Sequence, residues 1–139
     1  MLERLRILVV DDFEQWRNAV RSILAGDPGI EVVGECSDGL EAVAKTRELE
    51  PDLVLLDIQL PGNNGFVVAQ QITKIYPDIK ILFLSVHGPL ESLREALKIG
   101  AGLVAKANAT YDLLPTIWAV MRNEPIVRFR TLDKASDEP

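Results

Sequence analysis

Five short runs of apolar residues are spaced along the chain, and amphipathic stretches separate them. The runs lie at Arg6–Val10, Ile30–Cys36, Leu53–Leu56, Ile79–Leu84 and Gly102–Ala105. A short apolar run bounded by polar or turn residues is typical of a strand covered on both faces, and such strands belong mostly to parallel sheets packed between helices. The pattern therefore predicts five buried strands.

The stretches between these runs predict helices. Apolar positions in Phe13–Leu24 follow the i, i+3, i+4 spacing of a helix with one buried face, and Ser37 or Asp38 can cap a second helix over Gly39–Glu50. The remaining helices are marked by Val68, Ile72, Ile75 and Tyr76, by Leu90–Ile99 and by Thr110–Arg122. The repeated β-α order predicts an α/β fold: a doubly wound, five-stranded parallel sheet with five helices.

Pro115 lies about one turn inside the last predicted helix. Proline there removes a backbone donor and clashes with the preceding turn. We therefore expect a late start or a kink in this helix.

Asp57 directly follows the apolar run 53–56, and turn residues occupy 61–65. In parallel sheets ligands bind in the crevice outside the carboxyl ends of the strands, which is where Asp57 would lie. Alone, this position allows two interpretations, a functional acid or an acid that merely starts a loop.

Other predicted strands also end in polar residues. The first ends at Asp11 and Asp12, the fourth at Ser85 and the fifth at Lys106. A doubly wound sheet would gather all of these side chains, with Asp57, at one edge. Carboxylates about 5 Å apart repel by roughly 3 kcal/mol per pair at an effective dielectric of about 20, so a cation is needed besides the lysine.

An all-oxygen cluster without histidine or cysteine suits a hard divalent cation, and Mg²⁺ binds through one or two carboxylates while keeping waters and taking phosphate oxygens. We expect Asp12 and Asp57 to be the ligands, with Asp11 acting through water. A carboxylate can also attack phosphorus to form an aspartyl-phosphate. A metal, a lysine and a hydroxyl would then supply positioning and charge neutralisation.

The composition narrows the classes of function. A chain of 139 residues has room for one domain, and a net charge of −6 opposes direct binding of nucleic acid. No apolar run reaches the length of a membrane span, and no basic-then-apolar leader begins the chain, so we expect a cytoplasmic protein without membrane contact. Residues 123–139 lack periodicity and predict a tail whose last part is disordered.

The acid pair Asp11 and Asp12, Asp57 with Pro61 and Gly65 behind it, Ser85 and Lys106 resemble, in order and spacing, a response-regulator receiver domain of two-component signalling. The resemblance covers about residues 5–122, which implies a receiver domain over 1–122 followed by the tail 123–139. The segments VVDD and DIQLPGNNG and the Gly100–Gly102 turn are most similar to those of the NarL/FixJ-type branch. Receivers of that branch usually precede a helix-turn-helix domain. We expect no output domain in this chain.

The resemblance implies a flavodoxin-like fold with strand order 2-1-3-4-5. It also implies that Asp57 accepts a phosphoryl group from a sensor histidine kinase, and that Asp12, Asp57 and the backbone carbonyl of Gln59 bind Mg²⁺. Lys106 would contact the phosphoryl group and Ser85 would respond to it. Helices four and five with strand five would relay the change to a protein partner or a second copy of the chain.

Three positions depart from the family pattern. Ala107 replaces the proline that usually follows the lysine through a cis bond, so a trans bond and a shifted loop are expected, which puts the reach of Lys106 in question. Leu103 replaces the usual aromatic side chain, which breaks the usual coupling between hydroxyl and aromatic residue. Val86 replaces a small residue and can narrow access to Asp57, which predicts slow phosphorylation or slow loss of phosphate.

Two alternatives remain open. A degenerate receiver would act as a phosphorylation-independent binding module, as the three departures suggest. An aspartyl-phosphate phosphatase would share the acidic edge, but such enzymes need a second acid two positions after a nucleophile on the first strand, and Asp11-Asp12-Phe13 lacks that spacing. At most, self-phosphorylation and self-dephosphorylation at Asp57 would count as enzyme activity.

Overall fold

The computed structural model describes residues 3–86, 94, 96, 98–99 and 102–124. Five parallel strands form the main sheet in the order β2-β1-β3-β6-β7. They are β1 (Leu5–Val10), β2 (Ile30–Cys36), β3 (Leu53–Asp57), β6 (Lys80–Ser85) and β7 (Gly102–Ala105). Two further strands, β4 (Gln59–Leu60) and β5 (Asn63–Asn64), pair with each other in the loop after β3. Counted without that pair, the order is the predicted 2-1-3-4-5.

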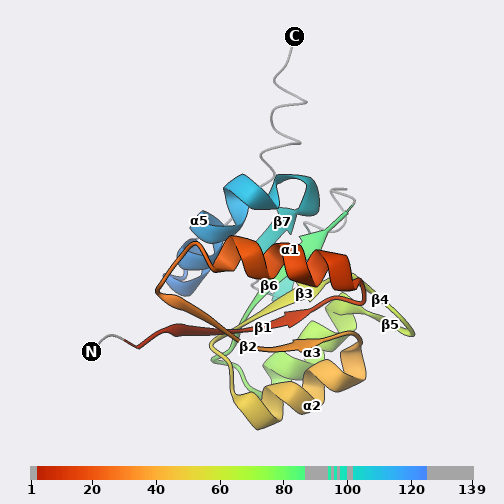
Figure 1. Cartoon of the computed structure of the whole chain (residues 1–139). Helices are drawn as coiled ribbons and strands as arrows, with labels where there is room; N and C mark the ends of the chain where they lie inside the picture. Colours follow the sequence, from red (N-terminus) through yellow and green to blue (C-terminus); the bar gives the residue numbers. More distant parts are fainter. Residues whose placement is uncertain (1–2, 87–93, 95, 97, 100–101, 125–139) are drawn as a thin grey trace.

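Helices cover both faces of this sheet, as predicted (Figure 1). On one face lie α1 (Glu14–Leu24) and α5 (Ala109–Met121), and on the other lie α2 (Gly39–Leu49) and α3 (Gly65–Ile75). The helix predicted over 90–99 falls mostly outside the described residues, where only Arg94, Ala96, Lys98 and Ile99 are described, all as helical. The tail beyond residue 124 also lies outside them.

Local polar contacts fix the ends of α2. Of the two candidate N-caps, Asp38 is the one observed, because its side chain accepts a hydrogen bond of 2.8 Å from the backbone N–H of Glu41. At the other end, Arg6 donates from Nη1 to the backbone carbonyls of Leu49 and Glu50, at 2.7 and 2.9 Å. A strand residue therefore satisfies carbonyls that the helix itself leaves unpaired.

The late start expected for the last helix is wrong, because α5 already begins at Ala109 and contains Pro115. The short 3-10 helix η1 (Lys106–Asn108) leads directly into it, since the N–H of Ala109 bonds to the carbonyl of Lys106. The first turn is thus set before Pro115 is reached. Leu113 and Ile117, both fully buried against the sheet, hold the helix across the proline. The alternative expectation, a kink, stays a prediction.

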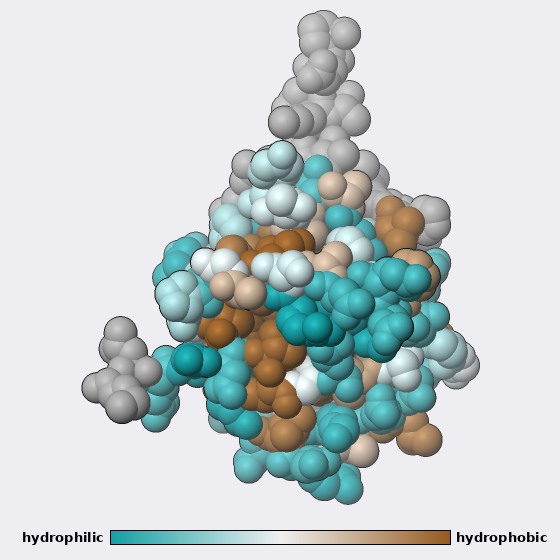
Figure 2. All heavy atoms as spheres, in the orientation of Figure 1, coloured by the Kyte–Doolittle hydropathy of each residue, from teal (hydrophilic) through white to brown (hydrophobic). Residues whose placement is uncertain are grey.

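The apolar side chains of α5 around Trp118 belong partly to the core. Trp118 is half-buried, packs on the cluster between the sheet and α1/α5, and donates from Nε1 to Asp27 Oδ2 at 2.7 Å. Asp27 lies in the loop that joins α1 to β2. In the face shown in Figure 2, hydrophobic side chains gather between α1 and α2, over the edge strand β2, where Val32 and Val33 are half-buried.

Every residue of β3 is buried, including its last residue, Asp57. The apolar residues Leu53–Leu56 face the two core layers alternately: Leu53 and Leu55 belong to the cluster under α1 and α5, and Val54 and Leu56 to the cluster under α2 and α3. The strand is therefore fixed on both faces. This anchoring places the Asp57 carboxylate firmly at the carboxyl edge of the sheet.

Candidate functional site

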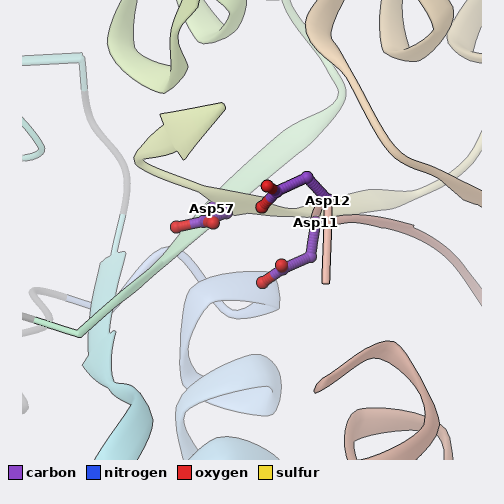
Figure 3. Close-up of side chains that lie close together, drawn as sticks. All are labelled: Asp11, Asp12 and Asp57. Carbon is purple, nitrogen blue, oxygen red and sulfur yellow. The ribbon is translucent and has the colours of Figure 1, made fainter. Parts of the chain in front are cut away.

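Three carboxylates meet at the carboxyl edge of the sheet. Val10 of β1 pairs with Leu56 of β3, so the residues that follow, Asp11 and Asp57, end on neighbouring strands, and Asp12 comes next in the chain. One oxygen from each of the three carboxylates lies within 4.8 Å of the others (Figure 3). The acidic cluster that the strand ends predicted is therefore present.

The three acids differ in environment. Asp11 is fully buried, and both of its carboxylate oxygens are engaged: Oδ1 accepts from the N–H of Phe13 at 2.9 Å, and Oδ2 from Lys106 Nζ at 2.6 Å. Asp57 is 5% exposed, whereas Asp12 is exposed to solvent. Asp11 is thus the most tightly engaged of the three acids, and its predicted action through water stays a prediction.

Asp57 sits in an environment that disfavours its charge. Burial raises the pKa of its carboxyl above the ordinary value, and the neighbouring charge of Asp11 raises it further. Lys106, whose Nζ lies 3.5 Å from Asp57 Oδ2, and the N–H of Gln59, 3.2 Å from Oδ1, lower the pKa but do not overcome those two effects. An additional cation at this edge would therefore be bound favourably.

The donor set fits a hard divalent cation. All three groups offer oxygen atoms, and their formal charge of three against the single charge of Lys106 leaves the cluster with excess negative charge. Mg²⁺ prefers such carboxylate sites and keeps several of its own waters there. The exposed Asp12 leaves one side of the cluster open to solvent for those waters.

Lys106 reaches the site without the cis bond typical of the family. Among the described residues no peptide bond is cis, so the expected trans link to Ala107 is confirmed. Lys106 is the first residue of the 3-10 helix η1. Its side chain is only 13% exposed and still lies between Asp11 and Asp57. Despite Ala107, the lysine therefore reaches both acids.

The other predicted site residues lie at differing depths. Ser85 ends β6, is 5% exposed and pairs with Ala105 of β7, directly before Lys106. Gln59 lies on β4 and donates its N–H to Asp57. Leu103 is fully buried in the cluster under α2 and α3, while Val86 is 64% exposed. Ser85 and Gln59 thus stand next to the site, and Leu103 is part of the core.

Two residues on α1 contribute to the site and were not predicted to do so. Arg17 donates from Nη1 to the backbone carbonyl of Asp11 at 2.7 Å and pairs with Glu35 of β2 at 3.3 Å. The ring of Trp16, which the helical pattern assigned to core packing, lies 5.1 Å from Lys106 Nζ. Their position one turn after the acid pair was the available signal.

The fold and this edge define a class, the flavodoxin-like α/β domains with a group of acids and a lysine at the carboxyl ends of the strands. Residues 7–117 match the family model of the response regulator receiver domain, and the chain belongs to that family. Receiver domains of this family act in two-component signalling. The interpretation made from the acids, the serine and the lysine is therefore confirmed at the level of the family.

Individual relatives support the resemblance to the NarL/FixJ-type branch. The chain is 39% identical over 121 residues to the response regulator GacA of Pseudomonas viridiflava, covering 86% of this chain and 56% of GacA. A solved LuxR-family response regulator from Aurantimonas has a TM-score of 0.88 at 28% identity, with 98% of each chain covered. The receiver domain of the putative response regulator NarL from Mycobacterium tuberculosis has a TM-score of 0.80 at 28% identity. The match covers 86% of this chain and 98% of that chain. The chain spans about half the length of the curated relatives it matches.

The part of the chain that the structure describes has no helix with the length and apolar character needed to span a bilayer.

Proposed function

We propose that Asp57 accepts a phosphoryl group from a sensor histidine kinase in the presence of Mg²⁺. The observation that carries this proposal is the position of the Asp57 carboxylate, held at a strand end beside Lys106 and the acids Asp11 and Asp12. Structural acids at a protein surface are not normally collected at such a cost in repulsion. The arrangement supports phosphoryl transfer better than it supports a purely structural role.

In the proposed transfer, a carboxylate oxygen of Asp57 forms the bond to phosphorus while the bond from phosphorus to the imidazole nitrogen of the donor breaks and the imidazole leaves. Lys106, already 3.5 Å from Asp57 Oδ2, neutralises charge on the phosphoryl oxygens. Asp12, Asp57 and the Gln59 carbonyl would hold Mg²⁺, which when bound would offset negative charge on the acids and the phosphoryl group. Asp11 holds the lysine through its 2.6 Å ion pair.

The phosphorylated state would then be relayed through the adjoining edge of the sheet. Ser85 pairs with Ala105 and so links β6 to β7, directly before Lys106. Adding about two negative charges beside these strand ends can shift a two-state segment. Because Leu103 is a buried aliphatic residue, an inward rotation of an aromatic side chain cannot carry the signal. The relay we propose runs through helices four and five to a partner or a second copy.

The described part of that face offers one large exposed hydrophobic side chain, Tyr111 of α5, which is 76% exposed. The fourth helix, which would complete the face, lies mostly outside the described residues. The relatives are whole regulators, and the output they produce is a property of those proteins. For this chain we propose that the output passes through a protein partner or through a longer regulator of which this is the receiver.

Binding of beryllofluoride, an analogue of the phosphoryl group, tests the proposal. In Mg²⁺, beryllofluoride is expected to bind wild type and to shift the amide NMR signals of residues around Asp57 and Lys106, while Asp57→Asn gives no such shifts. Failure to bind both Mg²⁺ and beryllofluoride would instead favour the degenerate binding module. Steady turnover of a generic phosphate ester would favour the phosphatase, because a receiver is phosphorylated once and releases phosphate slowly.

A further inference from the structure

The indole ring of Trp16 forms one wall of the space that holds the Lys106 ammonium group. The Nζ atom lies 5.1 Å from the ring centroid, within the distance at which a cation is attracted to an aromatic face. On its other sides the same atom meets Asp11 Oδ2 at 2.6 Å and Asp57 Oδ2 at 3.5 Å. The ammonium group is therefore held by two carboxylates and one aromatic ring.

This wall matters because the backbone alone does not constrain the lysine. Lys106 begins a short 3-10 helix and is followed by Ala107 through a trans bond, so no proline ring restricts its approach to the site. A lysine side chain has four flexible carbons and considerable rotamer freedom. Its confinement to 13% exposure must come from side chains packed around it.

Trp16 is itself firmly placed. It lies in the first turn of α1, its N–H bonds to the carbonyl of Phe13 at 3.1 Å, and its ring packs on the core cluster between the sheet and α1/α5. The next residue, Arg17, holds the backbone carbonyl of Asp11 at 2.7 Å. One turn of α1 therefore positions both the acid pair and the cation that faces it.

We propose that Trp16 is a positioning residue that holds the Lys106 ammonium beside Asp57 through the face of its ring. An arriving phosphoryl group then meets a cation that is already in place, instead of one that must be drawn from solvent. This inference rests on the proposed function, since it concerns the lysine of the same site. Trp16 acts through Lys106 and does not itself touch the reacting atoms.

The first test uses the metal-free wild-type protein and needs no phosphoryl analogue. A methylene group held over an indole face is shifted upfield by the ring current, so the Cε protons of Lys106 are expected upfield of those of the other lysines. Trp16→Leu should abolish the shift, and Trp16→Phe should retain part of it because a ring remains. A Lys106 signal at the ordinary lysine position in wild type would overturn the proposal without any variant having to fold.

The second test measures the affinity for beryllofluoride in Mg²⁺ by calorimetry. Loss of a partly exposed cation–π contact is expected to weaken binding by about two- to fivefold in Trp16→Leu, with Trp16→Phe closer to wild type. The matched control is Trp118→Leu, which removes the other indole that packs on the same cluster between the sheet and α1/α5. The Trp118 indole bonds to Asp27 and not to a residue of the site. Urea unfolding of each variant establishes that it is folded under the assay conditions.

The outcomes separate the two proposals. If wild type binds beryllofluoride and Trp16→Leu binds it equally well, the positioning role is wrong and the proposed function stands. If Trp118→Leu weakens binding as much as Trp16→Leu, the effect is a general loss of packing and the positioning role is again wrong. If wild type fails to bind, the proposed function is wrong, and the Lys106 proton shifts still decide whether Trp16 holds the lysine.

Discussion

Replacing Asp57 by asparagine removes one of three negative charges from the carboxyl edge of the sheet while keeping nearly the same shape. In wild type the burial of this carboxylate and the nearby charge of Asp11 raise its pKa, which means that its ionised form destabilises the folded state. The asparagine oxygen can still accept the hydrogen bond from the N–H of Gln59. We therefore expect Asp57→Asn to be more stable than wild type at neutral pH without metal.

The size of the effect follows from the distances. At about 5 Å and an effective dielectric of about 20, Asp11 and Asp12 would each repel Asp57 by roughly 3 kcal/mol. Lys106 Nζ, 3.5 Å from Asp57 Oδ2, attracts the carboxylate by roughly 5 kcal/mol at the same effective dielectric. Because these terms nearly cancel, the desolvation of the buried carboxylate decides the sign. We expect a net gain of about 1 to 2 kcal/mol in the free energy of unfolding.

The gain should depend on pH in a defined direction. A raised pKa means that the folded state keeps the proton of Asp57 to higher pH than the unfolded state does. The advantage of Asp57→Asn is therefore full above the folded-state pKa and shrinks as the pH falls below it. It is gone below the ordinary aspartate pKa, where Asp57 is protonated in both states.

Urea unfolding of both proteins in EDTA at pH 7, repeated at lower pH and in saturating Mg²⁺, measures the effect. Mg²⁺ should stabilise wild type more than the variant, because a ligand that binds only the folded state adds to its stability. A variant that is less stable than wild type in EDTA would refute the electrostatic reasoning. An advantage that grows as the pH falls would refute it as well.

Three further predictions concern residues around the site and in the core. Burial, and then the charge of Glu41, raises the pKa of the Cys36 thiol to about 12. A thiol-specific reagent should therefore label Cys36 only as fast as the protein unfolds. Rapid labelling of the folded protein would contradict this. Asp27→Ala should lower the free energy of unfolding by about 1 to 2 kcal/mol in urea titrations, because it removes the acceptor of both the Trp118 indole N–H and the Gly29 backbone N–H. An unchanged midpoint would show that these two hydrogen bonds contribute nothing. If Val86 narrows access to Asp57, Val86→Ala should react faster with a small phosphodonor, and equal rates would remove that role.

Much of the fold could be predicted because burial on both faces leaves a strong signal in the sequence. The runs Ile30–Cys36 and Gly102–Ala105 match β2 and β7, β1 and β3 differ from their runs by one residue at one end, and β6 is displaced by one residue at both ends. The pair β4 and β5 was not predicted, since strands of two residues have no periodicity and Pro61 and Gly62 indicate only a turn. The late start expected from Pro115 was wrong because α5 begins at Ala109, six residues before the proline, and its buried face packs on the sheet.

The candidate site was predictable as a set of strand ends and less so as a set of contacts. Parallel strands bring their carboxyl ends to one edge, which is why Asp11, Asp12, Asp57 and Lys106 could be grouped from sequence. The preference of Lys106 for Asp11 at 2.6 Å over Asp57 at 3.5 Å depends on side-chain geometry that no spacing encodes. Trp16 was hidden for a similar reason, since its helical position also fits core packing.

The central claim is that Asp57 is the phosphoacceptor, and mass spectrometry of the intact protein after reaction with a small phosphodonor tests it most directly. In Mg²⁺ wild type should gain one phosphoryl group, peptide mapping should locate it on Asp57, and the gain should be absent in EDTA and in Asp57→Asn. A wild-type protein that gains no phosphoryl group, or an Asp57→Asn variant that gains one as readily, would contradict the claim.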